Sequence, residues 1–464
     1  MLLGTRVMVQ CLRLVWVPML VYISEELKMS TLATGSVISS FSLGYLSTQI
    51  AGGIMADRYG GKPVQTMTMA IMVLAMMTAP HVADIAGASG LWVIYFHMGL
   101  FAGPQHPAYN AMVAAWFPQD ELGKVSSLCE AGPVAGNLLA IVVAPTIAST
   151  YGWRYSFWVF GTFGGIWLVV WQLLSKSAPD GMPDSLGDGA GLNSATQKRT
   201  TDKPSGLPWG MARHMAVWAV IAQHMVFNST KYFFADWMPT YFATIFHKQP
   251  QRSSWFLMFP ELVGVISQLF VAFLERRALK SGLSLLETRR YFGASAFIGT
   301  GFVIFNLAMA ESPTSVSALL CCLQLSLALH SCGYKANYLD ITQVHQGFFM
   351  GAGNTLASVM TFLVPISVAL TLERTHRDWW YVFMALVLFN MFGAFVAFRL
   401  ISVKRIDEDL KPEEALIDVE LFSESLTSSI SVNALTDMTE ALQDIHETIH
   451  KELFEDTDGN DHTD

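Results

Sequence analysis

The chain has 464 residues, of which 52% are hydrophobic and only 14% are charged. This balance is too apolar for a soluble globular protein and excludes that class. The apolar residues come in blocks of about twenty, the length that a helix needs to cross the core of a bilayer. Because backbone groups in lipid must be paired within their own segment, each block is predicted to be a helix. We therefore expect an all-α membrane protein.

Twelve transmembrane helices are expected in chain order, six before a polar stretch and six after it. The segments are 7–23, 32–56, 64–80, 91–117, 125–149, 155–174, 215–246, 256–274, 291–310, 316–333, 348–372 and 379–401. The seventh contains Pro239, so we expect it to be broken or tilted there. The stretch between the halves is rich in Ser, Gly, Asp, Lys and Pro, which is typical of a flexible linker. The predicted domains are an N-terminal six-helix bundle at 1–174, a cytosolic linker at 175–208, a C-terminal six-helix bundle at 209–402 and an acidic cytosolic tail at 403–464.

The net charge of -9 hides an uneven distribution. The tail holds about 18 acidic and 4 basic residues, so the rest of the chain is mildly basic. This pattern gives no reason to expect nucleic acid as a partner. Basic residues gather on one side of the predicted helices, which by the positive-inside rule places both termini, the linker and the charged loops in the cytosol. The choice between the plasma membrane and an organelle membrane stays open.

The tail carries one helical pattern and one misleading motif. Its apolar residues recur at helical spacing and predict one amphipathic helix, through Leu435, Met438, Leu442, Ile445, Ile449 and Leu453. We expect this helix to pair with a helical protein partner or to fold back on the basic cytosolic loops. The stretch His446–His450 fits the zinc motif H-E-x-x-H, but a metalloprotease needs a third ligand and a supporting fold. We expect no metal, no cofactor and no enzyme activity.

Ionised side chains inside the membrane segments are candidates for function, because a charge in lipid is costly and tends to face a cavity or a partner. Arg13 lies about halfway along the first segment and offers a bidentate fork to a carboxylate or phosphate. The alternative is a structural arginine paired with a helix carbonyl or an acid. Lys231, with Asn228 nearby, is either a second anion contact or an ion-pair partner of Asp236 or Glu130.

Groups that exchange a proton or hold a cation are the candidates for coupling. They are Glu130, His97, His106, Asp236, Asp340 and Asn337. A structural alternative stays open for each kind: an ion pair for the acids, a hydrogen bond within a packed helix for the histidines, and a helix-end cap for Asp340 and Asn337.

A short charged loop joins the second and third segments. We interpret its residues as a conformational latch between helix ends rather than as ligands: Gly53, Asp57, Arg58, Gly60, Gly61 and Lys62. A charged hinge after the eighth segment, at 275–280, repeats the pattern in the second half. Duplicated halves around a central site are typical of a transporter.

The loop pattern Gly53-x-x-x-Asp57-Arg58-x-Gly60-Gly61-Lys62 resembles the signature loop of the major facilitator superfamily. Five further stretches resemble its anion:cation symporter branch, which includes sodium/phosphate, sialic acid, vesicular glutamate and plastid anion transporters. They lie at 44–53, 152–161, 238–242, 333–341 and 351–355. The likeness covers nearly all of residues 1–402, and the tail lies outside it.

This resemblance implies a substrate-binding arginine in the first helix, and the matching position is Arg13. In the fourth helix the family carries a second arginine and a coupling glutamate, where this chain has Tyr95 and Ala102. Tyr95 is therefore a further substrate-binding candidate. The family's Asn-His-Leu-Asp becomes Asn337-Tyr338-Leu339-Asp340 here.

We predict a secondary transporter that carries a small organic or inorganic anion, a phosphate or a carboxylate, by alternating access. Sodium, protons or the membrane potential would drive it. The alternative is a non-transporting membrane receptor or scaffold of the same fold that signals through its tail.

Overall fold

The computed structural model describes residues 1–117, 122–176, 209–342 and 346–406. These residues form helices joined by short turns, and no strand occurs among them. The stretches 177–208 and 407–464 lie outside the described residues, and with them most of the predicted linker, the tail helix and the His446–His450 motif. A short 3-10 helix, Trp209–Arg213, falls in a second compact unit and is described by itself.

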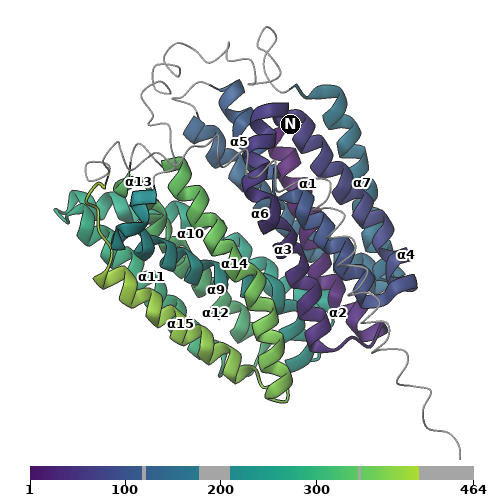
Figure 1. Cartoon of the computed structure of the whole chain (residues 1–464). Helices are drawn as coiled ribbons and strands as arrows, with labels where there is room; N and C mark the ends of the chain where they lie inside the picture. The colour runs from purple at the N-terminus through teal and green to yellow at the C-terminus, as the bar shows by residue number, and fades with distance from the viewer. Residues whose placement is uncertain (118–121, 177–208, 343–345, 407–464) are drawn as a thin grey trace, which may run out of the picture. The chain divides into compact units, whose positions relative to one another are not determined.

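The main unit contains the long helices of both halves of the chain (Figure 1). The first half, residues 1–176, has α1 (Leu2–Leu14), α2 (Trp16–Glu26), α3 (Thr31–Tyr59), α4 (Gly61–Ala102), α5 (Gln105–Trp116), α6 (Leu122–Tyr151) and α7 (Trp153–Leu174). The second half, residues 214–406, has α9 (Met215–Ile245), α10 (Pro250–Lys280), α11 (Leu285–Leu307), α12 (Pro313–Leu329), α13 (Ala336–Ile341), α14 (Gln346–Arg374) and α15 (Trp379–Arg399). A π-helical turn, Ser331–Lys335, joins α12 to α13.

Within the described residues, 8 helical stretches are long and apolar enough to cross a membrane. The longest, 53 residues at Gly61–Val113, bends at Gly87, whose φ of 54° and ψ of -138° leave the helical region. The bend falls between the predicted segments 64–80 and 91–117. α3, α9 and α11 have 29, 31 and 23 residues, which is also enough to cross a bilayer.

Of the break or tilt expected near Pro239, the break is wrong, because α9 runs unbroken from Met215 to Ile245 with Pro239 inside it, and the tilt stays a prediction. A proline removes one backbone hydrogen bond, and a membrane helix tolerates that loss where neighbouring helices cover it. Pro239 and the preceding Met238 are both buried. Tertiary packing therefore outweighs the local preference of proline to end a helix.

Glycines set the closest helix contacts. A Cβ on Gly44 of α3 would collide with the main-chain oxygen of Phe96, and a Cβ on Gly99 of α4 would collide with that of Phe41. Between α1 and α6, Gly132 faces Arg6 and Gly136 faces the Val7 carbonyl and Gln10. Small residues spaced by four bring membrane helices into backbone contact in this way. The contacts of Gly132 and Gly136 place α1, which carries Arg13, directly against α6.

Ion pairs hold helix ends together in each half. In the first half, Arg154 of α7 bonds both Glu26 of α2 and Asp84 of α4. In the second half, Arg289 of α11 is only 8% exposed and bonds Glu275 of α10 and Asp340 of α13. A planar guanidinium suits this role because its donors point in several fixed directions. These clamps make each half a braced group of helices.

Candidate functional site

Arg13 lies at the end of α1, and its guanidinium contacts aromatic rings from both halves. Its Cζ is 4.7 Å from the ring centroid of Phe41 in α3 and 5.3 Å from that of Tyr232 in α9. Tyr232 also hydrogen-bonds to the guanidinium. Cation–π contacts of this kind stabilise a guanidinium that has left water. The predicted charge in the first segment is therefore held between α3 and α9.

Arg13 remains available to a further anion. Among the described residues no carboxylate forms an ion pair with it. Asp236 of α9 interacts with it electrostatically, without an ion-pair contact. The side chain is half-buried, although its neighbours Leu12 and Leu14 are buried. A half-buried guanidinium without an ion-pair partner can donate hydrogen bonds to a carboxylate or a phosphate.

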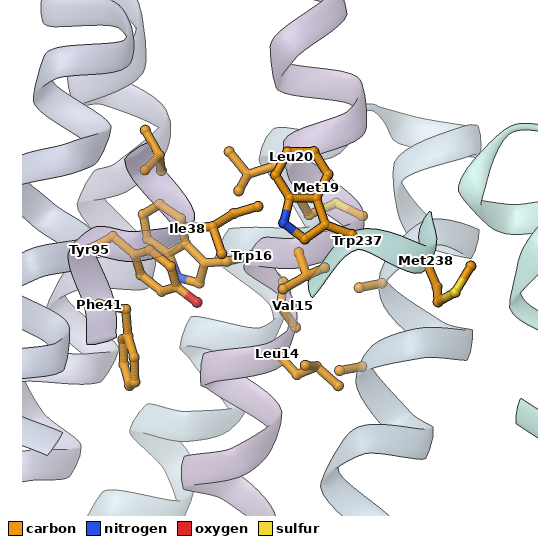
Figure 2. Close-up of a cluster of buried hydrophobic side chains, with 14 of the residues drawn as sticks. Leu14, Val15, Trp16, Met19, Leu20, Ile38, Phe41, Tyr95, Trp237 and Met238 are labelled. Atoms are coloured by element: carbon orange, nitrogen blue, oxygen red, sulfur yellow. The ribbon is translucent and has the colours of Figure 1, made fainter. Parts of the chain in front are cut away.

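An aromatic cluster positions the backbone that carries Arg13. Tyr95 of α4 is 3% exposed, and its hydroxyl donates to the main-chain carbonyl of Arg13 over 3.3 Å. Its ring stacks on Trp16 at 4.4 Å and lies 5.1 Å from Phe41. Figure 2 shows Tyr95 and Trp16 side by side, with Trp237 of α9 beside Met19 and Leu20 of α2. Tyr95 therefore uses its hydroxyl to hold α1 in place.

Lys231 and Asn228 lie on α9, within one turn of Tyr232. Asn228 is 7% exposed, whereas Lys231 is exposed and its Nζ lies 5.9 Å from the ring centroid of Phe227. Lys335, on the π turn of the second half, lies over the same ring at 4.5 Å. Tyr232 interacts electrostatically with both Arg13 and Lys231. The structure therefore brings the predicted arginine and lysine within electrostatic range of one tyrosine.

Sequence reasoning missed a second polar group, centred on Glu261 of α10. Gln324 of α12 donates to Glu261 Oε1 over 3.4 Å, and Asn137 of α6 hydrogen-bonds to the same carboxylate. Gln10 of α1 in turn donates to Asn137 Oδ1 over 2.8 Å. Lys231 interacts electrostatically with Glu261, so this group adjoins the arginine site. The sequence signal that could have revealed this group is an acid inside the predicted segment 256–274.

The coupling candidates fall in different places. The side chain of Glu130 lies outside the described part of the chain. His97 is exposed and its Nδ1 lies 2.8 Å from the Val93 carbonyl one turn earlier, and His106 is exposed beside the Tyr109 ring. Among the coupling candidates whose side chains the structure describes, Asp236, which is 9% exposed, is the one that interacts electrostatically with Arg13.

Asp340 and Asn337 belong to the helix-end clamp of the second half. Asp340 accepts from Arg289 Nε over 2.6 Å, and Asn337 donates to the Ser402 carbonyl over 2.9 Å. Arg289 also donates to the Cys332 carbonyl over 3.0 Å, which ties the clamp to the π turn. Both residues therefore brace the ends of α11, α13 and the segment after α15.

The predicted latch is described in part, because the burial of Gly53 and the side chains of Asp57 and Arg58 lie outside what the structure describes. Gly60 adopts a φ of 79°, a conformation that favours glycine, and separates α3 from α4. Gly61 packs against Ala108 and Met112 of α5. Lys62 donates to the Gln172 carbonyl of α7 over 3.0 Å.

Besides the Arg13–Tyr232 and Asn137–Glu261 contacts, a group of hydrogen bonds joins the halves towards the end of the helices where α2 ends and α3 begins. The Leu32 amide of α3 donates to Glu373 of α14 over 2.8 Å, and Ser39 Oγ donates to the Phe362 carbonyl over 2.8 Å. Ser254 Oγ of α10 donates to the Ile141 carbonyl of α6 over 2.7 Å. Gly35 of α3 adds a close approach to Pro365 and Ala369 of α14. The halves are therefore joined at this end.

Comparison with known proteins places this arrangement in a family. The family model described as Major Facilitator Superfamily matches residues 2–365. A probable anion transporter 4, chloroplastic, of Arabidopsis thaliana is 28% identical over 375 residues, which cover 78% of this chain and 69% of that protein. Sialin of Ovis aries is 28% identical over 366 residues, covering 78% and 73%. A sodium-dependent phosphate transport protein 1, chloroplastic, of Arabidopsis thaliana is 28% identical over 357 residues, covering 77% and 69%.

Solved structures agree with this assignment at the level of the fold. A bacterial homolog of the human lysosomal transporter Spinster, in an inward-facing and unoccupied conformation, matches with a TM-score of 0.69 at 11% identity. The match covers 86% of this chain and 95% of that one. The resemblance to the anion:cation symporter branch is confirmed by the curated relatives. The chain therefore belongs to the Major Facilitator Superfamily.

Proposed function

We propose that this protein is a secondary transporter of a small anion, a phosphate or a carboxylate, that works by alternating access. Its relatives are named as transporters of anions, of phosphate and of ascorbate, which supports an anionic substrate. Sodium, protons or the membrane potential would supply the drive. The comparisons give no support to a receptor or scaffold role.

One observation carries the proposal. Arg13 is a permanent cation in a membrane helix, it contacts one aromatic ring from each half, and no described acid forms an ion pair with it. Keeping a guanidinium in a membrane helix costs free energy, and an ion pair with an acid would offset this cost. No such pair with Arg13 occurs among the described residues. An anionic substrate that docks on Arg13 supplies the missing partner.

The remaining substrate residues take roles that fit their positions. Lys231 interacts electrostatically with Tyr232 and offers a second charge, and Asn228 offers an amide one turn away on α9. Tyr95 acts through the Arg13 backbone, by its hydrogen bond to the Arg13 carbonyl. Binding between Arg13 of the first half and Lys231 of the second draws both halves onto one anion, which is the requirement for alternating access.

The architecture we propose has twelve transmembrane helices in two six-helix bundles, with both termini in the cytosol. In this arrangement α1 and α2 act together as the first span, and α12, the π turn and α13 as the tenth. The Leu32–Glu373 end then faces away from the cytosol, and the described conformation is closed on that side. The latch residues Asp57, Arg58 and Lys62 lie at the cytosolic ends of α3 and α4.

The test is uptake of labelled phosphate and ascorbate into liposomes that contain the purified full-length protein. We expect Arg13→Gln to abolish uptake and Arg13→Lys to retain part of it, because lysine keeps the charge and loses the fork. Arg399→Gln is the matched control, since Arg399 is an exposed arginine at the end of α15. Undiminished uptake by Arg13→Gln would remove the site assignment.

A further inference from the structure

Glu261 lies where the two halves meet, and the amides of Asn137 and Gln324 hydrogen-bond to its carboxylate. Gln10 donates to the Asn137 oxygen, so the amide nitrogen of Asn137 is the group left to donate to the Glu261 carboxylate. Gln324 donates to the same carboxylate from α12. The network crosses between the halves, because Gln10 and Asn137 belong to the first half and Glu261 and Gln324 to the second.

The local packing is built to hold these side chains. Gly136 of α6 allows α1 to approach closely enough for Gln10 to reach Asn137, and a Cβ on Gly136 would lie 3.1 Å from the Gln10 Cβ. Gly264, one turn after Glu261, leaves room for Gln324, whose Cδ lies 3.3 Å from the Cβ that an alanine would add. Larger residues at these two glycines would push the amides away from the carboxylate.

The charge that balances Glu261 is Lys231, which is also a proposed substrate contact. The two interact electrostatically, and no direct ion pair joins these two described residues. An anion that engages Lys231 therefore competes with Glu261 for the same cation. A carboxylate beside a bound anion loses its favourable partner and gains a like-charged neighbour, and both changes favour its protonated form.

We propose that Glu261 is the proton-coupling group of this transporter: it balances Lys231 while the carrier is empty and takes up a proton from solution when an anion engages Lys231. This inference rests on the proposed function, because it needs an anion at Lys231. The anion and the proton then cross together, and release of the anion returns Lys231 to Glu261. The proton leaves to the water on the side where the anion is released.

The donor set favours a proton over sodium. A sodium ion needs several oxygen ligands, whereas Asn137 and Gln324 present amide nitrogens to Glu261. Two N–H donors and a nearby ammonium repel a metal cation, whereas a carboxylate can take up a proton without further oxygen ligands. Coupling through Glu261 therefore predicts dependence on pH and independence from sodium.

The other charged groups near Glu261 interact with Lys231 or Tyr232 rather than with Glu261. On α9, His224 interacts electrostatically with Lys231 and with Lys335 of the π turn. Arg13 of α1 is reached through Tyr232. The contacts from α6 and α12 are the neutral amides of Asn137 and Gln324. Lys231 is thus the charge that interacts with Glu261 directly.

The experiment compares wild type, Glu261→Gln and Glu311→Gln in liposomes, with labelled inorganic phosphate and ascorbate as probes. Glutamine mimics the protonated acid, and Glu311 is an exposed acid before α12 that serves as the control. A gradient of one pH unit supports up to about tenfold accumulation per proton in wild type and in the control. We expect Glu261→Gln to lose this accumulation while it exchanges internal for external anion at a rate within about threefold of wild type.

A spectroscopic readout separates coupling from a structural role. Infrared difference spectra on adding phosphate or ascorbate should show loss of one carboxylate band and gain of one carboxylic acid band in wild type, and neither change in Glu261→Gln. Proton-driven accumulation by Glu261→Gln, or accumulation that follows a sodium gradient in wild type, would overturn the inference while the proposed function stands. Loss of exchange as well as accumulation in a Glu261→Gln protein that unfolds at the wild-type temperature would also overturn it. Absence of any uptake of either anion by wild type would overturn both.

Discussion

Glu373 of the second half caps the first turn of α3 in the first half, and this contact offers a direct test of which end of the carrier is closed. The helix begins at Thr31, and its orphan amides need acceptors. Ser30 Oγ accepts from the Ala33 amide over 3.0 Å, and Glu373 Oε1 accepts from the Leu32 amide over 2.8 Å. When the halves separate at this end, water must replace the carboxylate at Leu32.

The magnitude follows from the exposure of the contact. A carboxylate at an exposed helix N-terminus contributes about 0.3–1 kcal/mol through the helix dipole. Its hydrogen bond adds little more, since water solvates both groups once they part. Glu373→Ala therefore removes about 1 kcal/mol from the joined state, which shifts the equilibrium between the two conformations by about fivefold. Glu373→Gln keeps an acceptor and loses the charge, so we expect it to shift the equilibrium by about half that free energy.

The assay is a distance measurement by electron spin resonance between labels at Lys28→Cys and Arg377→Cys, on a background without the native cysteines. Both positions are exposed in turns near the Leu32–Glu373 contact. We expect the long-distance fraction to grow in Glu373→Ala and to stay unchanged in the control Glu311→Gln. An identical distance distribution in Glu373→Ala and wild type would refute the assignment of this end as the closed one.

Two further predictions concern stability, measured as the thermal unfolding temperature in detergent. Gly99→Ala should cost about 1–3 kcal/mol because its Cβ meets the backbone of α3, whereas Gly165→Ala meets one side-chain atom at 3.7 Å and should be nearly neutral. Arg289→Met should cost about 3 kcal/mol because it leaves two partly buried carboxylates unpaired, while Arg277→Met, at an exposed position, should change stability by less than about 0.5 kcal/mol. Equal effects within either pair would contradict the packing and the ion pairing described above.

The sequence predicted the helical class and most helix positions because a membrane leaves few choices for the backbone. Apolar blocks of about twenty residues have to be helices, so the helical class follows from them directly. An error occurred where packing decides, because Pro239 suggested a break that α9 does not have. The separation of the predicted segments 64–80 and 91–117 agrees with the structure, since Gly87 between them leaves the helical conformation.

The candidate site was predictable in its charges and unpredictable in its contacts. Arg13 and Lys231 stood out because ionised residues are rare in apolar segments. Their partners could not be derived, since Phe41 and Tyr232 come from distant helices and aromatic residues are common throughout the chain. Tyr95 as a substrate contact stays a prediction, and the hydrogen bond of its hydroxyl to the Arg13 carbonyl was not predictable from the sequence.

The contacts of Glu261 could not be derived from the sequence either, and they explain how the proposed mechanism balances its charges. What distinguishes Glu261 from the other acids is the group of amides around it. These amides come from α1, α6 and α12, so no local sequence pattern reveals them. With Glu261 placed, each proposed anion contact has an acid within electrostatic range and outside ion-pair contact: Asp236 for Arg13 and Glu261 for Lys231. A tight ion pair would have to break before an anion could bind, and a lone cation would be too costly to keep in the membrane. An acid outside ion-pair contact lowers the cost of keeping the cation in the membrane, and no tight ion pair has to break before an anion binds. Each cation is therefore balanced when the carrier is empty and can still bind an anion.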